Sequence, residues 1–184
     1  MMHRAIFIDR DGTISEEVGY VYHAGLYKVF SWAGPAIRKI NENGMKAVLI
    51  TNQSGVGRGY FDEARVDEVH KILCAELAAY HAKLDAIYVC THHPEAGCDC
   101  RKPNPGMLLQ AQRELGIDLT QSFVIGDKYL DVETAHNAGA KGILVMTGYG
   151  RAERENHRTN VHQPDLVAEN LIEAVDANLN GALA

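Results

Sequence analysis

Short apolar segments of strand length recur along the chain, and more polar segments separate them. Their sequences are "AIFID", "AVLIT", "AIYVC", "SFVIGD" and "GILVM", at residues 5–9, 47–51, 86–90, 122–127 and 142–146. They are almost continuously apolar rather than alternating, which is typical of strands buried on both faces of a parallel sheet. The pattern therefore predicts five such strands.

The segment at residues 62–83 has helical periodicity and follows Asp62, a residue type that commonly caps helices. Its apolar positions, three or four residues apart, are Val66, Val69, Leu73, Leu77 and Tyr80. Cys74 is placed on the apolar side of this helix, near Leu73 and Leu77, and is expected to belong to the core rather than to bind a ligand.

Three shorter helices are predicted at residues 105–115, 130–139 and 169–175. The first opens with Asn104 and Pro105, a suitable cap and first-turn pair, and stops at Gly116. Strands that alternate with helices predict an α/β fold, a parallel sheet of five or more strands with helices on both faces.

The bulk properties fit a single domain over residues 1–184, 46% hydrophobic and 23% charged. A formal charge of −6 disfavours a nucleic-acid partner, and the absence of a long apolar segment disfavours a membrane one. We expect a cytoplasmic monomer that acts on a small molecule.

Polar residues follow several predicted strands, where an open parallel sheet binds its ligands. Asp9 and Asp11 end the first strand, and "TNQSGVGRG" ends the second at residues 51–59. Asp127, Lys128 and Asp131 follow the fourth strand, and Arg101 and Lys102 precede the helix at residues 105–115.

Three carboxylates at one sheet edge would repel one another, so the pattern indicates a hard divalent cation, Mg²⁺ being the simplest. A cation, a lysine and backbone amides around a carboxylate make a site suited to phosphoryl transfer. One aspartate can then be the nucleophile and the other the general acid. The alternative is an ordinary Asp-Gly turn and polar loops, which would require independent coincidences at four segments.

These residues resemble the four motifs of the haloacid dehalogenase (HAD) phosphatase superfamily: "DRDGT" at residues 9–13, "TN" at 51–52, Lys102, and "GDKYLD" at 126–131. The resemblance implies a Rossmann-like HAD fold, with Asp9 as the nucleophile and Asp11 as the general acid and base. It also implies that Thr51 and Lys102 hold the phosphoryl group. By the same resemblance, Mg²⁺ would be held by the Asp9 side chain, the Asp11 backbone carbonyl and Asp127, while Asp131 orients Lys102.

Members of this superfamily carry cap domains at either of two insertion points, and residues 13–46 and 91–101 leave no room for one. The short loops are similar to those of the D-glycero-D-manno-heptose 1,7-bisphosphate 7-phosphatases, with histidinol-phosphate phosphatases or another sugar-phosphate phosphatase as the alternative. That resemblance implies a substrate site formed by Glu17, Gly19, Tyr20, Asn52, Gln53, Ser54, Arg101 and Lys128. The order Gly34-Pro35 departs from the heptose family's pattern, which bears on substrate preference rather than on chemistry.

The segment "CTHHPEAGCDCRKP" at residues 90–103 holds three of the four cysteines. Cys90, His92, Cys98 and Cys100 are the ligand set of a closed structural Zn²⁺ site. His93 is the alternative histidine, and a redox pair of Cys98 and Cys100 is a weaker reading because the spacing is C-x-C. A zinc-binding loop here would fix Arg101 and Lys102. A non-catalytic, zinc-stabilised binding module is the remaining alternative, and the intact Asp9 and Asp11 disfavour it.

Overall fold

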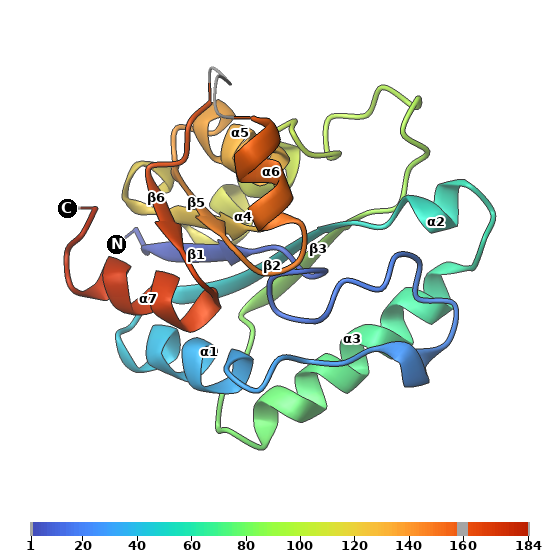
Figure 1. The fold of residues 1–184 in the computed structure, drawn as a ribbon, viewed down its shortest axis with the longest axis horizontal. Coiled ribbons are helices and arrows are strands. Elements are labelled where there is room, and N and C mark those ends of the chain that lie inside the picture. The colour runs from blue at the N-terminus through green and yellow to red at the C-terminus, as the bar shows by residue number, and fades with distance from the viewer. Residues whose placement is uncertain (1, 158–161, 184) are drawn as a thin grey trace.

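The computed structural model describes residues 2–157 and 162–183, and its centre is a six-stranded parallel sheet in the order β3-β2-β1-β4-β5-β6 (Figure 1). The strands are β1 (Ala5–Ile8), β2 (Lys46–Asn52), β3 (Ala86–Cys90), β4 (Phe123–Gly126), β5 (Lys141–Val145) and β6 (Leu166–Ala168). The first five match the apolar segments of the sequence.

Helices cover both faces of the sheet, so the predicted α/β class is confirmed (Figure 1). One face is covered by α1 (Ala33–Glu42), α3 (Glu63–Ala78) and α7 (Leu171–Leu179), and the other by α4 (Gly106–Leu115) and α5 (Tyr129–Asn137). Two short helices, α2 (Ser54–Gly57) and α6 (Gly150–Asn156), follow the ends of β2 and β5. Neither of these, nor β6, is predicted by the pattern, because each is too short to display a period.

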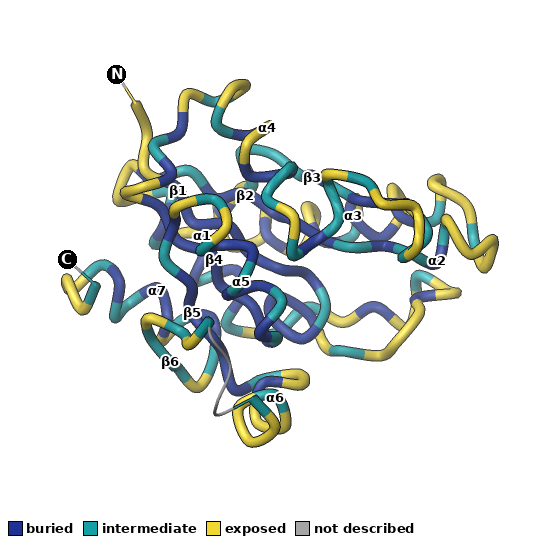
Figure 2. Tube along the Cα trace, turned by 90° about the horizontal axis from the view of Figure 1, so that it is seen from above, coloured by how far each residue is buried: buried dark blue, intermediate teal, exposed yellow. Residues whose placement is uncertain are grey.

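The central strands are the most buried part of the described chain, whereas the loops around α2 and before α1, and helix α6, are largely exposed (Figure 2). All four residues of β1 have no exposed surface. Buried apolar clusters on both faces therefore hold the sheet between its helices. This burial fixes the strand ends from which the functional side chains project.

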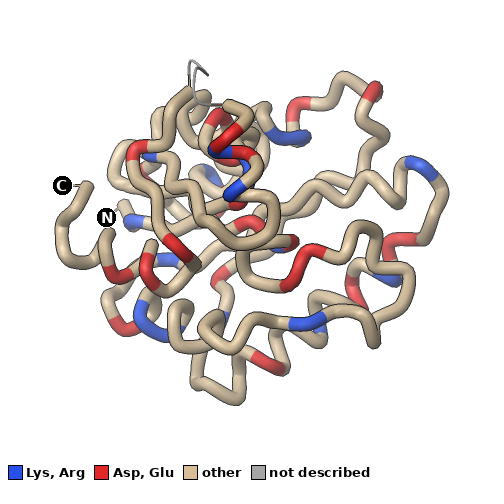
Figure 3. The backbone as a smooth tube through the Cα atoms, in the orientation of Figure 1, with Lys and Arg blue, Asp and Glu red and all other residues tan. Residues whose placement is uncertain are grey.

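Neither insertion point carries a cap domain. The chain between β1 and α1 forms a loop with one 3₁₀ turn (Ala24–Leu26), and the chain between β3 and α4 forms the cysteine loop. Among the described residues, no helix combines the length and apolar character that crossing a membrane requires. Acidic and basic residues are interspersed along the described chain (Figure 3).

Asp62 caps α3, its side chain accepting a hydrogen bond from the Arg65 backbone N–H, and Gly116 ends α4 in the left-handed conformation at φ 63°. Asn104 was predicted to cap α4, and this is wrong: its amide instead donates to the Cys98 carbonyl oxygen at 2.9 Å. The asparagine therefore braces the cysteine loop.

The predicted core positions of Cys74 and Tyr80 are also wrong, since both side chains are exposed. Residues adjacent in a helix point about 100° apart, so Cys74 lies outside the stripe that Leu73 and Leu77 bury. Tyr80 follows the end of α3 and covers Gly34 of α1, where a side chain would collide with its ring.

Candidate active site and zinc-type loop

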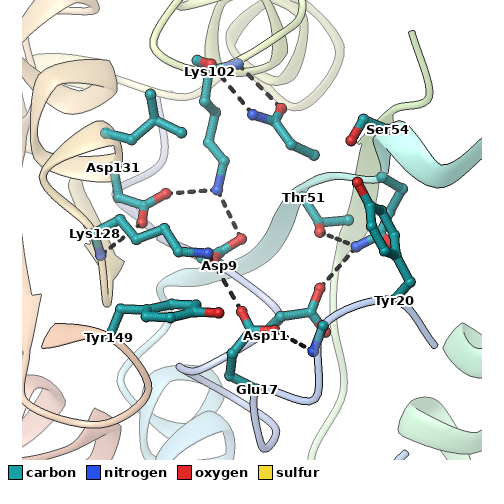
Figure 4. Close-up of a pocket in the computed structure, with 14 residues that line it drawn as sticks. Asp9, Asp11, Glu17, Tyr20, Thr51, Ser54, Lys102, Lys128, Asp131 and Tyr149 are labelled. Carbon is teal, nitrogen blue, oxygen red and sulfur yellow. Dashed lines mark hydrogen bonds and ion pairs between the residues drawn. The ribbon is translucent and has the colours of Figure 1, made fainter. Parts of the chain in front are cut away.

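The carboxyl ends of the central strands open into a cavity of about 290 Å³ (Figure 4). Strand β1 pairs with β2 on one side and β4 on the other, with Ile8 opposite Leu49 and Ile125. The sequence runs outward from β1 through β2 to β3 and returns to β4, which places a crevice beside β1. The cavity is lined by Asp9, Asp11, Glu17, Gly19, Tyr20, Thr51, Asn52, Gln53, Ser54, Lys102, Lys128, Leu130, Asp131 and Tyr149.

Lys102 bridges two aspartates in the buried part of this cavity (Figure 4). Its Nζ lies 2.7 Å from Asp9 Oδ1 and 2.6 Å from Asp131 Oδ1, and all three residues are buried. Burial alone would lower the pKa of Lys102, but the carboxylates of Asp131 and Asp9 raise it above its ordinary value. The lysine therefore stays charged, and Asp9, which contacts it through Oδ1, also lines the cavity.

Asn52 fixes the backbone from which Lys102 projects. Its amide accepts from the Lys102 N–H at 3.1 Å and donates to the Lys102 carbonyl oxygen at 3.3 Å. This two-way contact joins the end of β2 to the segment that follows the cysteine loop. Asn52 was assigned to the sugar side from resemblance; it lines the cavity and also holds the lysine.

Asp127 is fully buried next to this centre, and its Oδ1 atom has no hydrogen-bond partner among the described residues. Its Oδ2 accepts from the Tyr149 backbone N–H at 2.8 Å. Burial, and then the charge of Asp9, raises the pKa of Asp127 to about 8. Gly12 and Gly148 enclose this carboxylate at positive φ, and a Cβ atom on either would collide with it.

The carboxyl groups of Asp9, Asp127 and Asp131 can bring one oxygen each within 4.8 Å of the others. A buried, unpartnered carboxylate oxygen beside a second carboxylate is the arrangement that a divalent cation stabilises. Oxygen donors of this kind suit Mg²⁺. The residues present therefore fit the predicted metal, with Asp131 already committed to Lys102 and to the Lys128 backbone N–H.

Asp11 lies at the cavity wall and is held from two sides. The Arg10 guanidinium donates to both of its carboxylate oxygens, at 3.0 and 2.9 Å. The Gln53 amide donates to Asp11 Oδ2 at 2.9 Å and to Thr51 Oγ1 at 2.8 Å. Gln53 thus links the two polar residues that resemblance assigns to the phosphoryl group and the proton transfer.

The outer part of the cavity is formed by loops from opposite sides (Figure 4). Lys128 Nζ lies 3.4 Å from Glu17 Oε2 and 4.7 Å from the centre of the Tyr149 ring, a cation–π contact. Burial alone would lower the pKa of Lys128, but Asp127, Asp9 and Glu17 raise it. A cation therefore remains available near the mouth of the site.

Tyr20 forms the opposite wall and contacts other aromatic rings. Its ring centre lies 4.9 Å from that of Tyr60 and 6.3 Å from that of Phe61, in edge-on arrangements. Phe61 packs against Gly55 in α2, so these contacts connect the loop before α1 to the helix that carries Ser54.

Arg101 is the one predicted substrate residue that does not line the cavity. It is half-buried, and its Nη1 atom is buried with no hydrogen-bond partner in the part of the chain that the structure describes. It lies next to the Lys102 anchor, so a change of side-chain torsions would be needed for it to meet a ligand in the cavity.

The cysteine loop gathers three thiols and one imidazole. Cys90 Sγ lies 3.6 Å from Cys98 Sγ and from His92 Nδ1, while Cys100 Sγ lies 3.2 Å from His92 Nδ1 and 3.6 Å from Cys98 Sγ. Zn–S bonds of about 2.3 Å place tetrahedral ligands about 3.8 Å apart, close to these spacings. His93 is outside the set and accepts from the Glu95 backbone N–H through its Nδ1.

The electrostatics of the loop also require a cation if the thiols are ionised. Burial, together with hydrogen bonds to Cys90 and Cys98, raises the pKa of the Cys100 thiol to about 12. Three thiolates this close would repel one another unless a metal neutralised them. The set fits Zn²⁺ in a closed four-ligand site, which leaves no position for a reacting molecule.

Comparison with known proteins adds independent information. A family model described as HAD-hydrolase-like matches residues 99–174. A D-glycero-beta-D-manno-heptose-1,7-bisphosphate 7-phosphatase of Photorhabdus laumondii is 46% identical over 78% of this chain and 81% of the relative. A D-glycero-D-manno-heptose-1,7-bisphosphate 7-phosphatase of Thermosynechococcus vestitus is 38% identical over 96% of this chain and 95% of the relative.

The chain belongs to the heptose 1,7-bisphosphate 7-phosphatase family of HAD hydrolases.

Solved structures of this family have the same fold. The D,D-heptose 1,7-bisphosphate phosphatase of B. bronchiseptica, complexed with magnesium and phosphate, superposes with a TM-score of 0.89 at 32% identity. The match covers 96% of this chain and 98% of that one. The enzyme from Burkholderia thailandensis superposes with a TM-score of 0.73 at 26% identity over the same share of both chains.

Two residues of this heptose phosphatase family member were missed by the sequence reasoning. Arg10 lies between the two motif aspartates, and Tyr149 follows β5 and lies across the cavity from Tyr20 (Figure 4). Arg10 could have been suspected because it interrupts "DRD" with a cation. Nothing in "TGYG" at residues 147–150 marks Tyr149, because its place depends on how β5 packs beside β4.

Proposed function

We propose that this protein hydrolyses the 7-phosphate of D-glycero-D-manno-heptose 1,7-bisphosphate through an aspartyl-phosphate. The observation that carries the proposal is the buried Asp9–Lys102 pair beside Asp11 and Asp127 in a chain of this family. A buried carboxylate steadied by a cation is a suitable nucleophile for a phosphoryl group.

The site would hold Mg²⁺ through the Asp9 side chain, the Asp11 backbone carbonyl and Asp127. When bound, the ion supplies positive charge to the phosphoryl oxygens and balances the clustered carboxylates. The unpartnered Oδ1 of Asp127 supports this assignment.

In the first half of the reaction an Asp9 oxygen attacks phosphorus while the bond from phosphorus to the sugar oxygen breaks. Asp11 gives a proton to that leaving oxygen. Lys102 and the Thr51 hydroxyl, both in the buried part of the cavity, hold the Asp9 carboxylate and the phosphoryl oxygens. In the second half Asp11 takes a proton from water, whose oxygen attacks phosphorus and releases Asp9 and inorganic phosphate.

The outer cavity supplies the specificity of the proposed reaction. Lys128 and Arg101 bind the phosphate that is kept, with Arg101 turning from its half-buried position. The sugar contacts Glu17, Gly19 and Tyr20 on one side and Asn52, Gln53 and Ser54 on the other. The absence of a cap leaves this selection to short loops.

The cysteine loop has a structural role in this proposal. Zn²⁺ held by Cys90, His92, Cys98 and Cys100 would fix the backbone that leads to Lys102, which is two residues after Cys100. The Asn52 contact holds the same backbone from the other side.

The proposal is tested by kcat/KM measured with Mg²⁺ on heptose 1,7-bisphosphate, fructose 1,6-bisphosphate and histidinol phosphate. We expect the heptose bisphosphate to be the best substrate, with inorganic phosphate and the 1-phosphate as products. Asp9→Asn protein purified in parallel controls for contaminating phosphatase. A higher kcat/KM on histidinol phosphate would favour that alternative and refute the heptose assignment.

A further inference from the structure

Arg10 is among the largest fully buried side chains of the protein, with 1% of its surface exposed. Its guanidinium forms a two-pronged contact with Asp11, Nε to Oδ1 at 3.0 Å and Nη2 to Oδ2 at 2.9 Å. The Cζ atom of the guanidinium lies over the Tyr27 ring, 5.7 Å from the ring centre. The backbone turns around this residue, since the Arg10 carbonyl oxygen accepts from the N–H groups of residues 13–15.

Burying an arginine is costly unless a partner compensates the charge. Asp11 is the more exposed member of the pair, at 15% against 1%, and it lines the cavity. A solvent-facing carboxylate needs no buried counter-ion for stability. Arg10, whose burial is unfavourable, therefore lies behind Asp11, which lines the cavity. This is the arrangement expected if Arg10 orients the Asp11 carboxylate.

The contacts also determine which part of the Asp11 carboxylate is free. A carboxylate has about four lone-pair sites, two on each oxygen. Arg10 occupies one site on each oxygen, and Gln53 occupies the second site on Oδ2. Among these contacts, Oδ1 alone keeps a free lone pair.

We infer that Arg10 is a positioning residue that, with Gln53, fixes the Asp11 carboxylate so that its Oδ1 atom moves the proton in both halves of the reaction. The inference rests on the proposed function, because it assumes that Asp11 is the general acid and base. Oδ1 gives its proton to the sugar oxygen as the phosphorus–oxygen bond breaks. The same lone pair then accepts a proton from the attacking water.

The test compares two leaving groups in Arg10→Lys, which keeps the charge but cannot form the two-pronged contact. An alkoxide leaving group, as in a sugar phosphate, needs a proton in the transition state, whereas p-nitrophenolate leaves without one. The ratio kcat/KM reports only the steps up to aspartyl-phosphate formation. We expect it to fall about 10-fold or more on the sugar phosphate and less than about 3-fold on p-nitrophenyl phosphate.

Arg38→Lys is the matched control, because Arg38 is an exposed helix arginine paired with Glu42 outside the cavity. It should leave both ratios unchanged. Tyr27→Leu removes the ring beneath the guanidinium and should reproduce the leaving-group dependence at smaller size. If Arg10→Lys does not fold, as judged by circular dichroism, Tyr27→Leu decides the question.

Equal losses on the two substrates, or none, in the folded variants would overturn the inference. Such a result leaves the proposed function intact, because the wild-type protein would still hydrolyse the sugar phosphate through Asp9. Conversely, a wild-type protein that hydrolyses neither ester refutes the proposed function itself.

Discussion

The described residues include two clusters of possible metal ligands that are built in opposite ways. Asp9, Asp127 and Asp131 are all buried and come from the ends of β1 and β4 and the start of α5. The cluster of Cys90, His92, Cys98 and Cys100 begins at the end of β3 and continues into the loop that follows; Cys90 is buried, Cys98 and Cys100 are partly buried, and His92 is exposed. The first is assembled from segments far apart in the sequence, whereas the second lies within eleven consecutive residues that start at the end of β3.

The donor atoms differ in the same sense. Oxygen ligands bind a hard cation that can also contact a substrate, while thiolates and imidazole close the coordination shell of Zn²⁺. Lys102 is the residue that connects the clusters, since it follows the cysteine loop and ends between Asp9 and Asp131. In the proposed function, the buried cluster serves the reaction and the cysteine loop places the lysine.

The largest effect is expected from Asp9→Asn. The change removes the nucleophile but keeps the size of a side chain in contact with Lys102, so kcat should fall roughly 10³-fold or more while the fold persists. Steady-state kinetics and circular dichroism check both parts. Asp176→Asn, at an exposed ion pair with Lys39, is the matched control and should retain full activity. Appreciable turnover by Asp9→Asn would contradict the nucleophile assignment.

The loop is tested by Cys100→Ser. Loss of one ligand opens the closed site, so the zinc content should fall well below the expected value of about one per chain. Because a displacement of about 1 Å can cost up to about 10²-fold in rate, we expect kcat/KM to fall about 10-fold through misplacement of Lys102. Metal analysis and kinetics on the same preparation provide the measurement.

Cys74→Ser is the matched control for that experiment, because the Cys74 thiol is exposed on α3 and outside the cluster. It should change neither the zinc content nor the activity. Full activity in zinc-free protein would remove the link that we draw between the two clusters.

Arg101→Ala tests the role of Arg101, which lies between Cys100 and Lys102 in the sequence. Its loss should lower kcat/KM about 10-fold on a sugar bisphosphate and much less on a monophosphate ester, since only the former carries a second phosphate to bind. Lys128→Met should act in the same direction, because Lys128 already lies in the cavity. Equal losses on the two substrates with Arg101→Ala would contradict its phosphate role and indicate that it only supports the loop.

The smallest effect concerns how the buried residue His70 changes the stability of the fold at acidic pH. Burial, and then the charge of Arg10, lowers the pKa of His70 from 6.5 to about 4. Between these pH values His70 is protonated in the unfolded chain but neutral in the folded protein. The free energy of unfolding therefore falls as the pH falls from 6.5 to 4. The contribution is at most about 3 kcal/mol.

Urea unfolding of the wild type and of His70→Leu at several pH values measures this effect. The variant cannot take up the proton, so its free energy of unfolding should decline less between pH 6.5 and 4. Parallel declines in the two proteins would show that His70 does not carry the acid sensitivity.

Local features of the sequence were enough to predict much of the molecule. Five strands were predicted because short, continuously apolar segments that alternate with helical ones are typical of a buried parallel sheet. The cysteine loop was recognised because its three cysteines and its histidine are close together in sequence. The prediction of a core position for Cys74 was wrong because a period of 3.6 residues places adjacent positions on different faces of a helix. The prediction that Asn104 caps α4 was wrong because asparagine is suited both to capping a helix and to bonding a loop carbonyl. Only the packing selects between these two contacts.

What the sequence alone determined is the α/β class, the composition of both ligand clusters and the residue types that phosphoryl transfer needs. The tertiary structure decided which of those residues meet, since Lys102 and Asp9 are 93 positions apart and touch only because the sheet brings their segments together. It also decided that Arg10 is buried behind Asp11 and that Arg101 lies outside the cavity. The positions of Arg10 and Arg101 depend on packing among long side chains that are crowded together. Desolvation and packing select one arrangement among several that the sequence permits.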